Sequence, residues 1–221
     1  MNPSASASTA KKPELAAGAD PAIVTAVELI AETTDEGWET IKSTPALSIY
    51  RKKTGDSPVA IIKAKVLIPN VSIEDIMTVI WEVSVRVTWD SVMKGFRDVE
   101  VLSPDKGVIY FYVKPPVPFI AARDFVQVRC RQKLGEDWVI AYKSVERADC
   151  ELPQGYIRGE TRISGYRIAK KGEECEVDFI SQTDIKGSIP VGLLNTIAPL
   201  RAQEWIKKMT AAAQSLHTPS S

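Results

Sequence analysis

Side chains that could carry acid–base or metal chemistry are few in this sequence. There is one histidine, His217, and the three cysteines, Cys130, Cys150 and Cys175, have no CxxC spacing. Imidazole and closely spaced thiolates are the common protein ligands of zinc, and imidazole is the usual general base near neutral pH. We therefore expect no histidine-based catalysis, no metal and no cofactor. Sparse cysteines of odd number are typical of reduced thiols in the cytosol.

One pair of opposite charges has the spacing of neighbours on a helix. Arg86 and Asp90 lie four residues apart, so they can form a surface ion pair worth about 0.3–0.5 kcal/mol. Alternatively, Arg86 points inward. A buried guanidinium must be paired, and the phosphate of a ligand offers it a bidentate partner. The spacing alone leaves both interpretations open.

Two further segments alternate with the period of two that a β-strand gives. In residues 124–132 one face holds Phe125, Gln127, Arg129 and Arg131, and the other holds Val126, Val128 and Cys130. In residues 175–183 Ser181 and Thr183 follow Cys175, Val177 and Phe179 on one face. In both segments the polar positions either face water or line a polar part of an internal cavity.

The segment between two expected strands at residues 115–122 is apolar and stiffened by prolines. Its central residues are Pro116, Val117, Pro118, Phe119 and Ile120. Loops are usually polar and exposed, and an exposed apolar segment marks a contact with a partner or a membrane. We expect a lid that packs on the sheet and also acts as a gate, opening when it enters a bilayer.

Composition excludes several broad classes of protein. The chain has 221 residues, 44% of them hydrophobic, which suffices for one domain with its own core. Lys and Arg number 28, as do Asp and Glu, whereas a nucleic-acid binder carries a basic excess. No apolar run reaches the roughly 18 residues that span a bilayer. We expect a cytoplasmic monomer, with a disordered leader at 1–19, one domain at 20–217 and a disordered tail at 218–221.

Hydrophobic periodicity predicts the order of the elements. Helices are expected over about 12 residues from Pro21, from Ser72, at 85–89 and, bent by Pro199, at 191–216. Strands are expected at 38–43, 47–53, 59–68, 98–102, 108–114, 124–132, 138–144, 156–168 and 175–183. The last helix should bury Leu194, Ile197, Ala198, Trp205, Met209, Ala213 and Leu216. This order predicts an α+β fold, in which a curved antiparallel sheet of about nine strands wraps around the last helix and encloses a cavity.

Four segments, in order along these elements, resemble the START (steroidogenic acute regulatory related lipid transfer) family. They are Arg86-Val87-Thr88-Trp89-Asp90; Val113-Lys114-Pro115-Pro116 leading to Arg123-Asp124-Phe125-Val126; Tyr156-Ile157-Arg158-Gly159 with Ser164-Gly165-Tyr166; and the segment from Asp184 to Pro190, followed by Leu193-Leu194-Asn195. The resemblance covers residues 22–216. It implies a helix-grip fold with a tunnel for one hydrophobic ligand, such as a phospholipid, sterol or ceramide.

Within that family the motifs are most similar to the phosphatidylcholine transfer branch. The resemblance implies that Arg86 contacts the lipid phosphate and that Phe111 and Phe125 belong to an aromatic cage, although Ser181 and Gln182 stand where that branch has tyrosines. The sterol branch pairs the arginine matching Arg129 with an acidic residue, and here that position falls near Tyr110, so no acidic partner is expected. The lipid-binding residues implied are Arg86, Phe111, Val113, Phe125, Gln127, Arg129, Ser181, Thr183, Leu194 and Ile197.

These observations favour a carrier that takes one lipid, a phospholipid first and a sterol second, and exchanges it during transient contact with a membrane. A sensor that binds lipid and acts on a protein partner is an alternative. Helix-grip relatives also include enzymes that fold polyketides, but such chemistry needs a positioned acid or base. With no core histidine and no paired constellation, we expect no enzyme.

Overall fold

The computed structural model describes residues 20–32, 37–114 and 121–217. Its helices are α1 (Pro21–Ala31), α2 (Ile73–Trp81), α3 (Val83–Trp89) and α4 (Val191–Leu216). Its strands are β1 (Glu39–Ser43), β2 (Leu47–Thr54), β3 (Ser57–Pro69), β4 (Met93–Ser103), β5 (Lys106–Val113), β6 (Ala122–Leu134), β7 (Asp137–Ser144), β8 (Tyr156–Arg158), β9 (Glu160–Lys171) and β10 (Glu174–Asp184).

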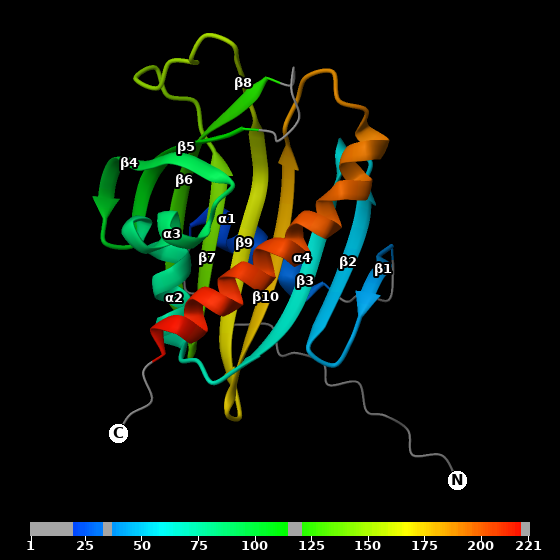
Figure 1. The fold of residues 1–221 in the computed structure, drawn as a ribbon, viewed down its shortest axis with the longest axis vertical. Coiled ribbons are helices and arrows are strands. Elements are labelled where there is room, and N and C mark those ends of the chain that lie inside the picture. Colours follow the sequence, from blue (N-terminus) through cyan, green and yellow to red (C-terminus); the bar gives the residue numbers. More distant parts are fainter. Residues whose placement is uncertain (1–19, 33–36, 115–120, 218–221) are drawn as a thin grey trace.

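The strands form one curved sheet in the order β1-β2-β3-β10-β9-β7-β6-β5-β4, with β8 paired to β6 (Figure 1). Neighbouring strands are antiparallel, except that β8 runs parallel to β6. Helix α4 crosses one face of the sheet, α1 lies behind the other, and α2 and α3 lie beside α4 near the β4 edge (Figure 1). The predicted helix-grip fold is confirmed.

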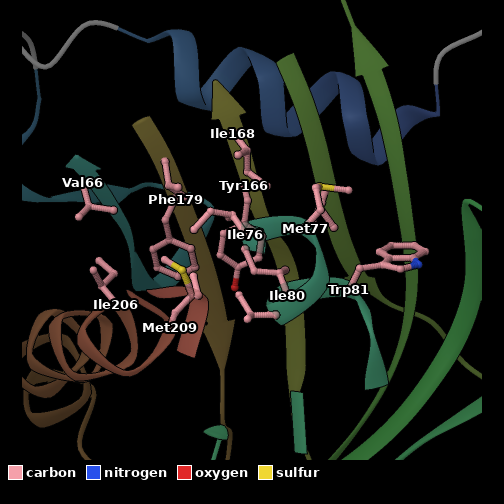
Figure 2. Close-up of a cluster of buried hydrophobic side chains, with 14 of the residues drawn as sticks. Val66, Ile76, Met77, Ile80, Trp81, Tyr166, Ile168, Phe179, Ile206 and Met209 are labelled. Atoms are coloured by element: carbon pink, nitrogen blue, oxygen red, sulfur yellow. The ribbon is translucent and has the colours of Figure 1, made fainter. Parts of the chain in front are cut away.

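Alternation along the strands gives each face its own core. On β10, Val177 and Phe179 belong to the large cluster that packs against α2 and α4, whereas Ile180 joins the smaller cluster under α1. Figure 2 shows Phe179 and Tyr166 of the sheet facing Met209 of α4. The face toward α4 is called the inner face below, and the face toward α1 the outer face.

Helix starts follow the capping rules that the sequence suggested. Asp20 accepts a hydrogen bond from the backbone N–H of Ala22, and Pro21 opens α1. At α2, Ser72 and Asp75 form a capping box, in which each side chain accepts from the other's backbone N–H, at 3.0 and 2.8 Å. The helix predicted from Ser72 is therefore confirmed, with Ser72 as its N-cap.

One predicted strand is divided in the structure, which raises the number of strands to ten. The expected strand 156–168 is broken at Gly159 into β8 and β9. A Cβ at Gly159 would lie 2.3 Å from Cε1 of Phe125, so the chain passes directly over that ring and leaves the β6 edge. The strand expected at 98–102 also begins five residues earlier, at Met93.

Helix α4 has the predicted bounds and contains Pro199, but its buried face is rotated from the predicted one by roughly 60° at 100° per residue. Its buried residues are Asn195, Pro199, Ala202, Ile206, Met209 and Ala213. The prediction is confirmed for Met209 and Ala213 and wrong for Ile197 and Leu216, which are exposed. It missed the amide of Asn195 and the ring of Pro199, which face inward.

Candidate functional site

A buried ion pair on α3 lies between the inner face of the sheet and α4. Arg86 is 6% exposed and Asp90 3%. Oδ2 of Asp90 accepts from Nε and Nη2 of Arg86, at 3.3 Å each, and from Nε1 of Trp205 on α4 at 3.1 Å. Nη1 of Arg86 donates to the carbonyl of Ile80 at 3.3 Å. The surface ion pair is therefore wrong, and Arg86 points inward.

Aromatic rings surround this guanidinium. Its central carbon lies 5.5–6.0 Å from the ring centroids of Trp89, Phe96, Tyr142 and Trp205. Tyr166 stacks on Trp205 with centroids 5.2 Å apart. The faces of these rings carry partial negative charge, so they stabilise a cation where water cannot. We call Arg86, Asp90 and these five aromatic residues the Arg86 box.

Electrostatics keep the box cationic at its centre and its phenols protonated. Burial opposes ionisation of Arg86, but Tyr166, Tyr142 and Asp90 outweigh it, and the pKa of Arg86 is raised. Burial also raises the pKa of Tyr142 and of Tyr166. Both phenols are therefore neutral near pH 7 and can donate a hydrogen bond. The box can receive a polar or anionic group and surround it with donors.

Phe111 and Phe125 continue the box along the inner face of the sheet. The two residues are direct partners on β5 and β6, and their rings stack at 5.0 Å. Phe96, which faces Arg86, meets Phe111 edge-on at 6.0 Å. The family resemblance placed both residues in an aromatic cage; the structure brings their rings into contact, and the cage role stays a prediction. Val113 lies at the end of β5 and is half-buried.

A chain of polar side chains lies on the inner face where the register between β9 and β10 shifts. Nε2 of Gln127 donates to Oγ1 of Thr161 at 2.7 Å, and that hydroxyl lies 3.1 Å from Oγ1 of Thr183. Oγ of Ser181 is 3.2 Å from Thr183. The structure therefore brings the predicted residues Gln127, Ser181 and Thr183 together. Thr161 was missed because the register of β9 and β10 shifts beside it, which simple alternation does not reveal.

Arg129 lies on β6 near α2, where it is the direct strand partner of Tyr142 in the Arg86 box. It is 8% exposed, its Nη1 donates to the carbonyl of Trp81 at 2.6 Å, and its Nη2 donates to Oδ1 of Asp98 at 2.8 Å. The prediction that it has no acidic partner is wrong, because the carboxylate comes from β4, one strand beyond Tyr110. Its buried Nε has no partner among the described residues.

The remaining predicted residues fall in three different places. On α4, Leu194 is half-buried and Ile197 is 37% exposed, so the predicted inward orientation of Ile197 is wrong. The gate segment 116–120 lies outside the described residues, and its role stays a prediction. Within the described ranges, no group of His, Cys, Asp and Glu could hold a metal ion, and no helix is long and apolar enough to cross a membrane.

Residues that sequence reasoning missed are mainly the rings of the box. Tyr142, Tyr166 and Trp205 come from β7, β9 and α4, and each lies more than fifty residues from Arg86 in the sequence. A signal was present in the strands, since Tyr166 and Phe179 both occupy inward positions of their alternation. Only the pairing of β9 with β10 shows that they meet, in register and with rings 5.2 Å apart.

Comparison with known proteins places this arrangement in a family. The START domain profile matches residues 22–218. The chain belongs to the START domain family. Human START domain-containing protein 10 is 26% identical over 178 residues, which are 80% of this chain and 61% of that protein. Mouse phosphatidylcholine transfer protein is 26% identical over 191 residues, covering 83% of this chain and 87% of that protein.

Other START proteins resemble the chain over shorter shares of their length or in fold alone. Human ceramide transfer protein is 19% identical over 201 residues, which are 81% of this chain and 32% of that protein. The solved structure of human StAR-related lipid transfer protein 5 superimposes with a TM-score of 0.81 at 16% identity, covering 89% of this chain and 95% of that one. Human STARD10 gives 0.76 at 24% identity, covering 81% and 74%.

Proposed function

We propose that this START domain binds one lipid between the inner face of its sheet and α4, and transfers it between membranes without chemical conversion. The observation that carries the proposal is the Arg86 box, a buried cation amid aromatic rings between the sheet and a long helix. Relatives named for phosphatidylcholine transfer and ceramide transfer support a lipid ligand. Phosphatidylcholine or a similar phospholipid is the ligand we place first.

Energetics explain why a carrier needs an enclosed interior and a polar anchor. A diacyl lipid in water exposes about 30 methylenes, at roughly 0.8 kcal/mol each, so unassisted transfer costs tens of kcal/mol. An apolar interior replaces the bilayer at nearly equal free energy. The headgroup then needs partners, and a phosphate can take the bidentate position on Arg86 that Asp90 occupies. Phe111 and Phe125 offer apolar contact beside it.

The polar chain of Gln127, Thr161, Ser181 and Thr183 gives the interior a second place for hydrogen bonds. A hydroxyl can both donate and accept, so this chain can rearrange around an ester carbonyl or a hydroxyl of the ligand. We propose that it contacts the glycerol region of a phospholipid whose headgroup lies in the Arg86 box.

We also propose that the outward stripe of α4 touches the membrane. Leu193, Ile197 and Leu200 lie at i, i+4 and i+7, on one side of the helix, and are 50, 37 and 62% exposed. Three large apolar side chains in one exposed row favour contact with an apolar phase. The predicted interior role of Ile197 is thereby replaced by an outer one.

A sterol ligand is the second candidate, and Arg129 favours it. Its pairing with Asp98 supplies the acidic partner expected for that branch, and its buried Nε is free to donate to a single hydroxyl. Arg129 lies on the same strand face as Phe125, so a ligand held there also contacts the inner face of the sheet. The identity of the copurified lipid separates the two candidates.

The test is lipid identification followed by transfer. Native mass spectrometry of the purified chain should show one bound lipid, and extraction should identify a phospholipid. Arg86→Lys keeps the charge opposite Asp90 but loses the planar fork, so we expect transfer of phosphatidylcholine between vesicles to fall about tenfold or more. Arg201→Lys, on the exposed side of α4, is the matched control. Bound lipid without transfer favours a sensor, and wild-type rates in Arg86→Lys exclude Arg86 as the phosphate contact.

A further inference from the structure

Arg123, at the start of β6, is a buried cation held by carbonyl groups. It is 3% exposed. Its Nη1 donates to the carbonyl of Ala121 at 2.5 Å, its Nε to that of Ile185 at 3.0 Å, and its Nη2 to that of Lys186 at 3.1 Å. No ion pair joins it to a carboxylate within the part of the chain that the structure describes. Burial without an anion lowers the pKa of Arg123.

The two carbonyls beyond its own strand belong to the linker between β10 and α4. That linker turns sharply, since Lys186 and Gly187 both adopt positive φ, 48° and 81°. A Cβ at Gly187 would lie 3.0 Å from Nη2 of Arg123 and 2.9 Å from Cδ1 of Ile157 on β8. Glycine is therefore required for the linker to approach this closely. Arg123 fixes the path by which the chain enters α4.

The N-terminal half of α4 is tied to the sheet through Asn195. Its N-cap, Pro190, makes no side-chain capping bond. Asn195 accepts from the backbone N–H of Ala60 at 2.9 Å and donates to the carbonyl of Pro58 at 3.2 Å, both on β3, and its own carbonyl accepts from Nη1 of Arg51 at 2.8 Å. That carbonyl is the one that Pro199 leaves without its helical donor. The helix thus has a weak point at 195–199, with the linker on one side of it.

The C-terminal half is held more firmly. Trp205 donates to the buried Asp90, Met209 is fully buried, and Nδ1 of His217 lies 2.9 Å from Oδ2 of Asp75 at the start of α2. If α4 moves, these contacts act as the fixed end, and residues 191–199 form the free end. That free end carries the exposed apolar stripe proposed to meet the membrane.

We propose that Arg123 is a positioning residue, which holds residues 191–199 of α4 closed over the inner face and whose release limits lipid exchange. The second half of this proposal rests on the proposed transfer function. Carbonyl oxygens suit such a role, because a carboxylate partner would hold the guanidinium more strongly and make release slow. Both linker carbonyls belong to adjacent residues, so the linker can be released as one unit.

Hydrogen exchange tests the hold on α4 without any lipid assay. In Arg123→Met, amides of 191–198 should exchange about tenfold faster or more, while amides of 205–213 keep their wild-type rates. Arg162→Met is the matched control, because Arg162 is a half-exposed arginine that bonds the turn at Asp56. If hydrogen exchange is accelerated equally in both halves of α4, or in neither half, the proposal is overturned. If Arg123→Met does not fold, Arg123→Lys and Gly187→Ala, which disturb the same linker, must show the same local pattern.

Vesicle transfer then tests the role in exchange. Arg123→Met should load and release lipid faster in equal proportion, so the rate rises while the partition of lipid between protein and vesicles stays constant. A variant that only damages the structure would instead lower the fraction of lipid bound to the protein. Faster local exchange with an unchanged transfer rate overturns the rate-limiting role of Arg123. If wild-type protein transfers no lipid, the proposed function fails, and hydrogen exchange still decides whether Arg123 holds α4.

Discussion

Replacing Arg86 by leucine isolates a carboxylate in the interior. Asp90 is 3% exposed, and its Oδ2 would keep one donor, Nε1 of Trp205. Removing one partner of a buried ion pair costs about 3–5 kcal/mol, chiefly because the other charge is left uncompensated. For a domain of this size that corresponds to a drop in Tm on the order of 10 °C. The cost thus exceeds what the two bonds of 3.3 Å from Arg86 would suggest.

The double variant Arg86→Leu/Asp90→Leu separates two causes of instability, the unpaired buried charge of Asp90 and the lost contacts of the Arg86 side chain. It leaves no buried charge in the box, and its main defect is the indole N–H of Trp205 without an acceptor, which costs about 1–3 kcal/mol. We therefore expect the double variant to be more stable than Arg86→Leu alone. Arg201→Leu removes an exposed arginine paired with Glu204 and should change stability by less than about 1 kcal/mol.

Urea unfolding of lipid-free protein provides the measurement, because bound lipid would add its own stabilisation. Arg86→Leu, Asp90→Leu and the double variant form a double-mutant cycle, and the buried pair predicts a coupling of several kcal/mol. If the losses of the single variants add to within about 0.5 kcal/mol, the pair is not coupled and the reasoning fails. The same cycle helps to interpret lipid assays of Arg86→Leu, because this variant loses stability as well as the proposed contact with the lipid phosphate.

Three further outcomes can be checked with simple variants. Gly159→Ala should cost about 1–3 kcal/mol in urea unfolding, because its Cβ meets the Phe125 ring, whereas Gly55→Ala, with open space around it, should be nearly neutral. Asp75→Asn should lower stability at pH 7, and this loss should disappear only at a pH well below 3.8. Although burial opposes it, the backbone N–H of Ser72 and the side chain of His217 lower the pKa of Asp75 from its ordinary value of 3.8, so its contribution is full above 3.8 and is lost as pH falls through the lower pKa of the folded state. Leu200→Ser should slow vesicle transfer while Leu102→Ser, 51% exposed on β4, should not; equal rates would remove the α4 stripe from membrane contact.

Much of the fold could be predicted because strands and helices have different hydrophobic periods. The bounds of α4 follow from local patterns, whereas only the resemblance to the START family placed Phe111 and Phe125 in one aromatic cage. The break at Gly159 could not be predicted, since it depends on the ring of Phe125 packing against a distant glycine. The buried face of α4 was missed for the same kind of reason, because Asn195 faces inward to bond β3. Contacts between distant segments override local preference there.

In the candidate site, too, some features follow from the local sequence and others from contacts between distant segments. That Arg86 and Asp90 could pair was visible from their spacing, but burial depends on Trp205, which reaches Asp90 from the far end of the chain. The carboxylate partner of Arg129 comes from β4, where bulges shift the register and break the alternation. Residue types near a site can be read from motifs, whereas their partners depend on strand order.

The outer-face contacts of the sheet do not involve α4, so under the proposal above part of this helix can open without unfolding the domain. Nζ of Lys63 donates to the carbonyls of Ile30 and Glu32 and so caps the C-terminus of α1. Arg167 bridges Asp137 and Asp178 at 2.8 Å each, which ties β7, β9 and β10 together on that face. These contacts and the core under α1 stay intact when residues 191–199 lift, so opening costs only the local contacts of that half helix. A sheet stabilised from its outer face can therefore keep its inner face for a ligand that comes and goes.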